Sequence, residues 1–290
     1  MPVPTGPRQF HHGDFDVVQL VEAKADHHVS VCLPARDEES TVGPIVATVR
    51  RQLVERWPLV DEVLVVDDSS TDGTARAAAD AGARVVAAAD VLPDHGGGPG
   101  KGDALWKSLH VCKGDLVVWC DADVRGFSAR FVTGLLGPLL LHQQVGFVKA
   151  RYDRPVAPGA TEGGGRVTEL VARPVISLLF PALTGFAQPL AGECAGRREV
   201  FEQVPFVRGY GVDIALLLDV VERFGLASVA QVDLGVRLHR NRPLGQLSEA
   251  ATSVLHAALT RAGVEVADPP GVEVGERPPL VEVAAYRQRP

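Results

Sequence analysis

The sequence predicts an α/β protein in which helices cover both faces of a mainly parallel sheet. Two observations favour this class. Short apolar segments alternate with helix-like segments from residue 29 to about residue 150, an order typical of parallel sheets. The segment 115–120 is apolar at successive positions, as strands buried on both faces are. From residue 151 the alternation stops, which predicts a smaller mixed α+β part.

Residues 29–150 supply the alternating elements. The expected strands are short apolar runs at Val29–Leu33, Val63–Val66, Arg84–Ala87, Asp115–Cys120 and Val145–Lys149. The expected helices have apolar residues at helical spacing over about 40–57, Thr71–Ala81, Lys101–Cys112 and Ser128–Leu141. Ser40 and Thr41 offer an N-cap for the first of these helices, and Pro44 suits its first turn.

The remaining segments differ in character. Residues 1–28 predict an N-terminal arm with a partial helix from Phe15 to Ala25. Residues 151–262 predict a strand near Ser228–Leu234 and helices at Val167–Leu179, Val212–Arg223 and 246–262. Residues 263–290 are rich in Pro, Glu and Val, and we expect this tail to be loosely held.

Composition limits the classes of function. The formal net charge of −7 excludes a polycation that coats nucleic acid or anionic lipid. The cysteines show no zinc or disulfide spacing, which predicts reduced thiols and a cytoplasmic protein; they are Cys32, Cys112, Cys120 and Cys194. Proline and glycine interrupt the uncharged stretch 175–192, so a buried helix and a loop are favoured over a membrane span.

Acidic residues follow the predicted strands. Asp121 and Asp123 come directly after the strand 115–120, and Asp67 and Asp68 end an earlier one. Ligands bind beyond the carboxyl ends of parallel strands, and two carboxylates there can hold a hard divalent cation, or one can hold a ribose. The alternative is that these carboxylates only cap the helices that follow.

A basic cluster follows the last predicted strand. It reads Arg237-Leu238-His239-Arg240-Asn241-Arg242. So much positive charge in one loop favours a phosphate ligand, and His239 could complete a metal site. A solvated basic turn is the alternative.

Two Gly-rich segments precede predicted helices. Residues 95–100 lead into Lys101, but Gly102 follows this lysine, so the segment is not a Walker A loop. A Gly-rich approach to a helix still suits a diphosphate or a sugar. Residues 163–168 repeat the arrangement and suit a second anion; a surface loop with a capping Thr168 is the alternative.

The order of these motifs resembles that of a GT-A glycosyltransferase. The motifs are Pro34-Ala-Arg-Asp-Glu-Glu39, Val66-Asp-Asp-Ser-Ser-Thr-Asp-Gly-Thr74, Gly100-Lys-Gly-Asp-Ala104 and Asp121-Ala-Asp123. Later motifs are more specific and resemble the actinobacterial glucosyl-3-phosphoglycerate synthases: Lys149-Ala-Arg-Tyr-Asp-Arg-Pro155, Gly165-Arg-Val-Thr168, Gln188-Pro-Leu-Ala-Gly-Glu193, 205–213 and 237–242. The resemblance covers about residues 29–262.

The resemblance implies a GT-A, Rossmann-like sheet and a retaining transfer of glucose from UDP-glucose to 3-phosphoglycerate. It implies a divalent cation, with Mg²⁺ ahead of Mn²⁺ or Co²⁺, a homodimer, and a place in methylglucose lipopolysaccharide synthesis in mycobacteria and their relatives. Residues 29–150 would then bind the nucleotide sugar. Residues 151–262 would bind the acceptor and complete the metal site.

The resemblance also assigns site residues. For the nucleotide sugar it implies Pro34, Ala35, Arg36, Asp37, Glu38, Ser69, Lys101, Asp121, Ala122, Asp123, Tyr210, Gly211, Val212, Asp213, Arg237, Leu238, His239, Arg240, Asn241 and Arg242. For the metal it implies Asp123 and His239, with Asp121 as a further candidate. For the acceptor it implies Gly165, Arg166, Val167, Thr168 and Asn241.

The mechanism depends on whether a carboxylate attacks the sugar. Glu193 and Asp213 are the candidate nucleophiles, but the resemblance favours a front-face route with the Leu190 backbone near the anomeric carbon. The catalytic set is then Lys101, Asp123, Leu190, Asp213 and His239. Asp213 stands where the family pattern has the longer Glu, which affects the contact with a sugar hydroxyl.

Three other functions are considered. One is a related GT-A transferase, such as a mannosyl-3-phosphoglycerate synthase or a polyprenyl-phosphate enzyme. Another is a nucleotide-sugar-binding module without turnover, against which Lys101, Asp121, Asp123 and His239 argue. A nucleotidyltransferase typically carries a Gly-rich loop after its first strand, where this chain has Pro34-Ala-Arg-Asp-Glu38.

Overall fold

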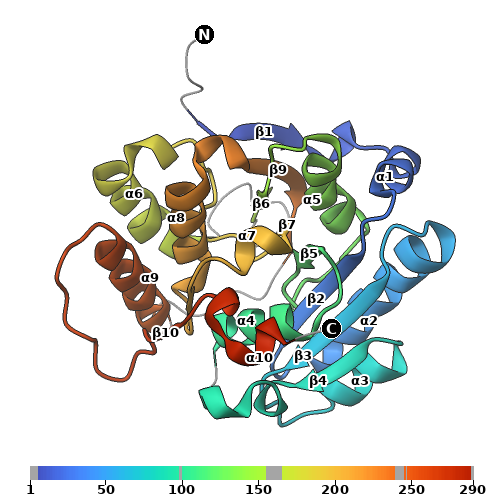
Figure 1. The fold of residues 1–290 in the computed structure, drawn as a ribbon, viewed down its shortest axis with the longest axis horizontal. Coiled ribbons are helices and arrows are strands. Elements are labelled where there is room, and N and C mark those ends of the chain that lie inside the picture. Colours follow the sequence, from blue (N-terminus) through green and yellow to red (C-terminus); the bar gives the residue numbers. More distant parts are fainter. Residues whose placement is uncertain (1–5, 98–99, 155–164, 239–244, 246, 289–290) are drawn as a thin grey trace.

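The computed structural model describes residues 6–97, 100–154, 165–238, 245 and 247–288. Over these residues the main sheet has eight strands in the order β1-β9-β6-β7-β5-β2-β3-β4 (Figure 1). The strands are β1 (Arg8–His11), β2 (Val29–Ala35), β3 (Glu62–Asp67), β4 (Arg84–Ala87), β5 (Leu116–Trp119), β6 (Phe147–Asp153), β7 (Cys194–Arg197) and β9 (Val229–Val236). A second, two-stranded sheet pairs β8 (Phe206–Val207) with β10 (Glu276–Arg277).

Helices lie on both faces of the main sheet. They are α1 (Val17–Lys24), α2 (Glu39–Val49), α3 (Thr74–Asp80), α4 (Lys101–Val111), α5 (Arg130–Leu141), α6 (Arg173–Leu179), α7 (Arg198–Phe201), α8 (Val212–Phe224), α9 (Ser248–Arg261) and α10 (Ala284–Arg287). π-helical turns at Arg50–Arg56 and Thr168–Ala172 adjoin α2 and α6. Short 3₁₀ turns occur at His12–Asp14, Ala88–Asp90, Pro93–His95, Pro181–Leu183, Leu226–Ser228 and Leu280–Glu282.

The alternation predicted over residues 29–150 is confirmed. Strand β2 pairs in parallel with β3 and β5, and β3 pairs in parallel with β4. Each expected strand and helix of this half is present within a few residues of its expected ends. The predicted α/β class therefore holds.

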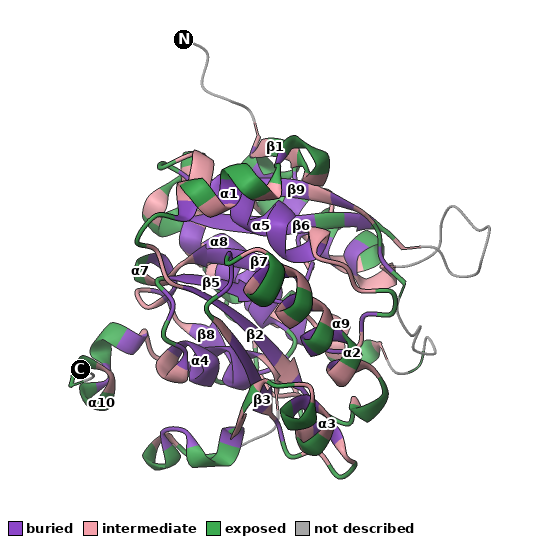
Figure 2. Ribbon diagram, turned by 90° about the vertical axis from the view of Figure 1, so that its right-hand side faces the viewer, coloured by how far each residue is buried: buried purple, intermediate pink, exposed green. Residues whose placement is uncertain are grey.

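The sheet separates two apolar cores. Cys32 of β2 belongs to the core shared with α4 and α8, whereas its neighbours Val31 and Leu33 belong to the core shared with α2 and α5. This alternation follows because successive strand side chains point to opposite faces. In Figure 2 the central strands and helices α4, α5 and α8 are mostly buried, whereas exposed residues lie on α1, α2, α3 and α9.

Strand β7 was missed by the sequence prediction. It lies between β5 and β6 and runs antiparallel to both, so the sheet is mixed. Its sequence, Cys-Ala-Gly-Arg, has few of the β-branched residues that mark a strand. Gly196 is required by packing, since a Cβ there would lie 2.5 Å from the Phe201 ring and 2.8 Å from the Gly146 carbonyl.

The ends of the chain are more ordered than expected. The arm contains the predicted helix as α1, but it also forms β1, which pairs in parallel with β9. The expectation that residues 263–290 are loosely held is wrong for residues 276–283. There β10 pairs with β8, and Leu280 and Val283 are buried in the core with α4. Our boundaries at residues 28, 150 and 262 stay a prediction.

The cysteines and the uncharged stretch 175–192 were used above to predict the compartment. All four cysteines are buried, and none of them forms a disulfide. No helix in the described part of the chain is both long and apolar enough to span a bilayer. The expectation of a buried helix in the stretch 175–192 is wrong, because Ile176 is the one buried residue of α6. A 3₁₀ turn follows at Pro181–Leu183.

Candidate active site

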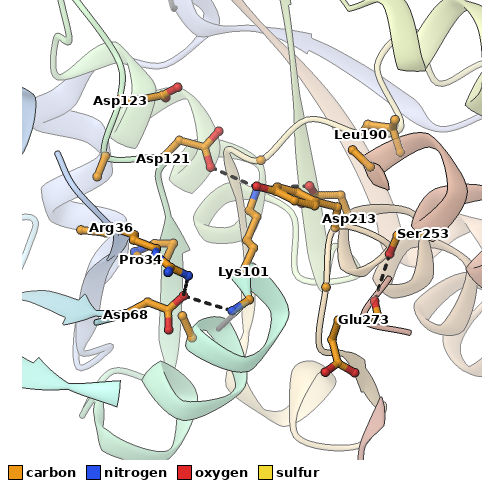
Figure 3. Close-up of a pocket in the computed structure, with 18 of the residues that line it drawn as sticks. Pro34, Arg36, Asp68, Lys101, Asp121, Asp123, Leu190, Asp213, Ser253 and Glu273 are labelled. Atoms are coloured by element: carbon orange, nitrogen blue, oxygen red, sulfur yellow. Dashed lines mark hydrogen bonds and ion pairs between the residues drawn. The ribbon is translucent and has the colours of Figure 1, made fainter. Parts of the chain in front are cut away.

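A cavity of about 480 Å³ opens at the carboxyl ends of the parallel strands (Figure 3). Pro34 and Ala35 end β2, Asp68 follows β3, and Asp121 follows β5. These strands run in the same direction, so their carboxyl ends meet at one edge of the sheet, as the strand-end carboxylates predict. The volume is typical of a site for a small molecule.

The cavity is lined by residues from both halves of the chain and from the C-terminal segment. They are Pro34, Ala35, Arg36, Glu38, Asp68, Gly100, Lys101, Ala104, Asp121, Ala122, Asp123, Arg154, Leu190, Gly192, Gly209, Tyr210, Asp213, Arg237, Glu249, Ala250, Ser253, Val272 and Glu273.

Lys101 lies at the first turn of α4 and points between two carboxylates (Figure 3). Its Nζ is 3.0 Å from Asp121 Oδ1 and 3.1 Å from Asp213 Oδ2. Burial acts to lower the pKa of Lys101, but the charges of these two carboxylates outweigh it and hold that pKa well above its ordinary value. Lys101 is therefore a fixed cation in the centre of the cavity.

Arg237 links the two aspartates that follow β5. Its Nη2 lies 2.9 Å from both Asp121 Oδ2 and Asp123 Oδ1. Burial acts to raise the pKa of Asp121, but Lys101 and Arg237 together hold that pKa well below its usual range. Asp121 is thus a carboxylate clamped by two cations, whereas Asp123 keeps a third of its side chain exposed.

Glu193 stands behind Arg237. It is fully buried, and its carboxylate accepts hydrogen bonds from Arg237 Nε at 2.7 Å and from the Tyr152 hydroxyl at 2.5 Å. Burial raises the pKa of Glu193, against the opposing charge of Arg237. It is not among the residues that line the cavity. Its position suits holding Arg237 better than attacking a sugar.

Leu190 and Gly192 both line the cavity, and Gly192 lies beside the pair formed by Lys101 and Asp121. A Cβ at position 192 would lie 2.3 Å from Lys101 Nζ and 2.5 Å from both Asp121 carboxylate oxygens. A side chain at this position would therefore displace Lys101 or Asp121. Leu190 also lines the cavity, and its expected place near the anomeric carbon stays a prediction.

Most residues assigned to the nucleotide lie together. Arg36 Nη1 is 3.9 Å from Asp68 Oδ2, and the same oxygen accepts a hydrogen bond from the Gly100 amide at 3.0 Å. Among the described residues assigned to the nucleotide, Asp37, Ser69 and Leu238 do not line the cavity. Asp37 and Ser69 have left-handed backbones, with φ of 55° and 63°. Gly211 and Val212 also stay outside the lining, buried behind Tyr210.

The residues assigned to the acceptor lie at the turn before α6. Gly165 has a φ of 77°, and its carbonyl accepts a hydrogen bond from the Glu169 amide at 3.0 Å. Thr168 is buried, and none of Gly165, Arg166, Val167 or Thr168 is among the residues lining the cavity. Their role with the acceptor stays a prediction.

The basic loop is described only in part. Leu238 is half exposed and forms a β-bridge with Arg125. His239, Arg240, Asn241 and Arg242 lie outside the described residues, so the proposed pairing of His239 with Asp123 is untested. Within the described ranges there is no cluster of three or more His, Cys, Asp or Glu side chains able to hold a metal.

Several lining residues were missed by the sequence analysis. Asp68 is one of the strand-end carboxylates for which helix capping was the alternative, but it was not assigned to the site. Arg154 follows β6 within a motif quoted above. Gly100, Ala104, Gly192 and Gly209 also lie within quoted motifs without having been assigned to the site. No local pattern marks the others, which are Glu249, Ala250, Ser253, Val272 and Glu273.

Residues 30–204 match the family described as Glycosyl transferase family 2. Glucosyl-3-phosphoglycerate synthase from Petrotoga mobilis is 40% identical, over 97% of this chain and 96% of its own length. The protein of the same name from Mycolicibacterium smegmatis is 48% identical, over 86% of this chain and 82% of its own length. The chain belongs to the glucosyl-3-phosphoglycerate synthase family.

Solved structures of a glucosyl-3-phosphoglycerate synthase, from Mycobacterium tuberculosis, share the fold. One in complex with Mn²⁺, UDP-glucose and phosphoglyceric acid matches with a TM-score of 0.88 and 39% identity, over 97% of this chain and 99% of that one. Another, with Mg²⁺ and UDP, has a TM-score of 0.87 at 40% identity, over 95% of this chain and 99% of that one. The predicted GT-A fold of this chain is thereby confirmed.

Proposed function

We propose that this chain transfers glucose from UDP-glucose to 3-phosphoglycerate, with a divalent cation, and forms glucosyl-3-phosphoglycerate. The main observation behind this proposal is the cavity at the strand ends, which is lined by Lys101, Asp121, Asp123 and Asp213. The chain that forms this cavity is a member of the glucosyl-3-phosphoglycerate synthase family. Relatives named for this reaction match nearly the whole chain, which supports assigning the whole activity to it.

The donor would lie along the strand ends. Pro34, Arg36 and Glu38 line the part of the cavity that suits uridine. Lys101 lies beyond them, where its ammonium group can face the diphosphate or the sugar. Asp213, paired with Lys101 at 3.1 Å, is placed to accept a hydrogen bond from a glucose hydroxyl.

The residues present fit a hard divalent cation. Carboxylate oxygens are the ligands that Mg²⁺ and Mn²⁺ prefer, and Asp123 offers an exposed carboxylate at the cavity wall. Asp123 would hold the cation with His239, and Asp121 is a further candidate. The bound cation would offset charge on the departing diphosphate.

The remaining residues would organise the transfer. Lys101 and Arg237 supply fixed positive charge where the leaving group gains negative charge, the arrangement that lowers such barriers most. Glu193 is buried and paired with Arg237, and Asp213 is paired with Lys101. Neither carboxylate is free of a cation, which supports a front-face route with retention over a covalent glucosyl adduct.

The test is a matrix of nucleotide sugars against small phosphorylated acids, each with and without EDTA. We expect UDP release and an α-linked product with UDP-glucose and 3-phosphoglycerate, and loss of turnover with EDTA. Higher turnover with GDP-mannose would contradict the choice of donor, and the substitution of Asp for Glu at position 213 makes this comparison informative. UDP binding without turnover on any acid would support a binding module instead.

The proposal has three further parts. Four buried cysteines that form no disulfide support a cytoplasmic location. Assembly as a homodimer and entry of the product into methylglucose lipopolysaccharide synthesis follow from the family resemblance alone. Sedimentation of the purified protein would test the dimer.

A further inference from the structure

The C-terminal segment packs against the helix that carries Lys101. Strand β10 pairs with β8, placing Arg277 opposite Phe206, and the segment continues across α4 into α10 (Figure 1). The Trp106 indole of α4 donates a hydrogen bond to the Pro278 carbonyl at 2.8 Å. A segment more than 160 positions later in the sequence therefore contacts the first turns of α4.

Arg277 makes the central contacts of this packing. Its Nε lies 2.5 Å from Asp103 Oδ1, and its guanidinium also donates to the carbonyls of His95 and Gly96, the latter at 3.0 Å. The guanidinium lies 5.4 Å from the centre of the Trp106 ring. One buried side chain thus joins the start of α4 to the Gly-rich segment before it.

Asp103 makes this link rigid. It is almost fully buried, it is two residues from Lys101, and its second oxygen lies 3.0 Å from Lys107 Nζ. Its amide also donates to the Arg208 carbonyl, next to β8. A buried carboxylate held by two cations has little freedom to shift, and a guanidinium fixes direction as well as charge.

We propose that Arg277 is a positioning residue for the donor site: it holds His95, Gly96 and the first turn of α4 so that Lys101 meets Asp121 and Asp213. The inference rests on the proposed function. Arg277 does not line the cavity, so it acts through α4 and not by touching the substrate. The positioning depends on the geometry of the Arg277 side chain and not on its charge alone. A planar guanidinium can donate to one carboxylate and two carbonyls at once, which a lysine ammonium in the same place would not do.

The test compares Arg277→Met and Arg277→Lys with the control Arg287→Met, an exposed arginine of the same segment. UDP affinity is measured by calorimetry with Mg²⁺, and amide hydrogen exchange over residues 93–104 is followed without nucleotide. We expect both Arg277 variants to bind UDP at least about tenfold more weakly and to exchange faster over 93–104. The KM for UDP-glucose should rise and that for 3-phosphoglycerate should stay unchanged.

A purely structural role gives a different result. If Arg277 only stabilises the fold, its variants should have a lower melting temperature but the same UDP affinity and the same amide exchange over residues 93–104 as the wild-type protein. That result would overturn the inference. If Arg277→Met does not fold, Arg277→Lys and Asp103→Asn carry the same comparison. If the wild-type protein binds no UDP, both the proposed function and this inference are wrong. If the wild-type protein binds UDP and the Arg277 variants bind it equally well, only this inference is wrong.

Discussion

Lys101 balances two carboxylates that would otherwise face each other across the cavity. Replacing it by methionine keeps the bulk of the side chain and removes the charge shared by Asp121 and Asp213. We expect Lys101→Met to lower kcat/KM by about 100-fold or more, since fixed charge at a leaving group is worth several kcal/mol. Steady-state kinetics measure the loss, with circular dichroism to check folding. The exposed Lys113→Met is the control and should keep full activity.

Asp123 is the aspartate most open to the cavity. Asp123→Ala removes the carboxylate assigned to the cation, so we expect Mn²⁺ affinity in the presence of UDP to fall at least about tenfold and metal-dependent turnover to be lost. Electron paramagnetic resonance of Mn²⁺ measures the affinity without any turnover. Asp26→Ala, at an exposed turn, is the matched control. Unchanged Mn²⁺ binding in Asp123→Ala would exclude this residue as a ligand.

The backbone at Gly192 lies so close to Lys101 that it leaves no room for a larger side chain at this position. A methyl group at this position would overlap Lys101 Nζ and the Asp121 carboxylate and push the pair apart. We expect Gly192→Ala to reduce kcat at least about tenfold and stability by about 1–3 kcal/mol. Gly97→Ala, where a Cβ meets nothing within 4 Å, should change neither. Kinetics and urea unfolding of both variants make the comparison.

At the scale of elements, Glu62 joins β3 to its neighbours. Its carboxylate accepts hydrogen bonds from the Ser30 hydroxyl of β2, at 2.6 Å, and from Arg84 of β4, at 2.7 Å. Burial acts to raise the pKa of Glu62, but the hydrogen bonds from Ser30, Lys113 and Arg84 outweigh it, and the pKa lies below its ordinary value. A depressed carboxyl pKa stabilises the fold above the unfolded-state value and loses this effect as the pH falls.

The stabilisation by ionised Glu62 at neutral pH gives a prediction for the stability of Glu62→Gln. At pH 7 the variant should be less stable than the unchanged protein by about 1 kcal/mol. The pKa of Glu62 is lowered in the folded protein, so the stabilisation is lost progressively as the pH falls below the ordinary glutamate value of about 4.3, and the difference should shrink. Urea unfolding at pH 7 and pH 3 measures it. A difference that grows on acidification would contradict the assignment.

The elements also show where sequence patterns succeed. Strands β2, β3 and β5 are recognisable because burial on both faces demands continuous apolar residues. The strand-end carboxylates Asp121 and Asp123 are predictable for the same reason, since the end of each strand fixes their place. Strand β7 cannot be predicted in this way. Its Gly196 is required by the close contact with Phe201, and a local sequence pattern does not indicate such a tertiary contact. Glu249, Ser253 and Glu273 reach the cavity only through tertiary packing.

At the scale of the molecule, the C-terminal segment completes one of the two cores. Leu280 is fully buried among residues of that core, while its neighbour Val281 is 36% exposed. We expect Leu280→Ala to lower the free energy of unfolding by about 2–4 kcal/mol, the cost typical of a cavity in a packed core. Val281→Ala should cost well under half as much. Equal, small effects in urea unfolding would mean that the segment is loosely held after all.

Because β7 is the only strand that pairs with both β5 and β6 in the described part of the chain, the sheet without residues 194–197 would consist of two separate blocks, β1-β9-β6 and β5-β2-β3-β4. A nascent chain that has emerged only to about residue 190 exposes the unpaired edge of β5. Such an edge invites pairing with a second chain. Fragments that end before β7 should therefore aggregate on expression, whereas in fragments that include β7 both edges of β5 are paired.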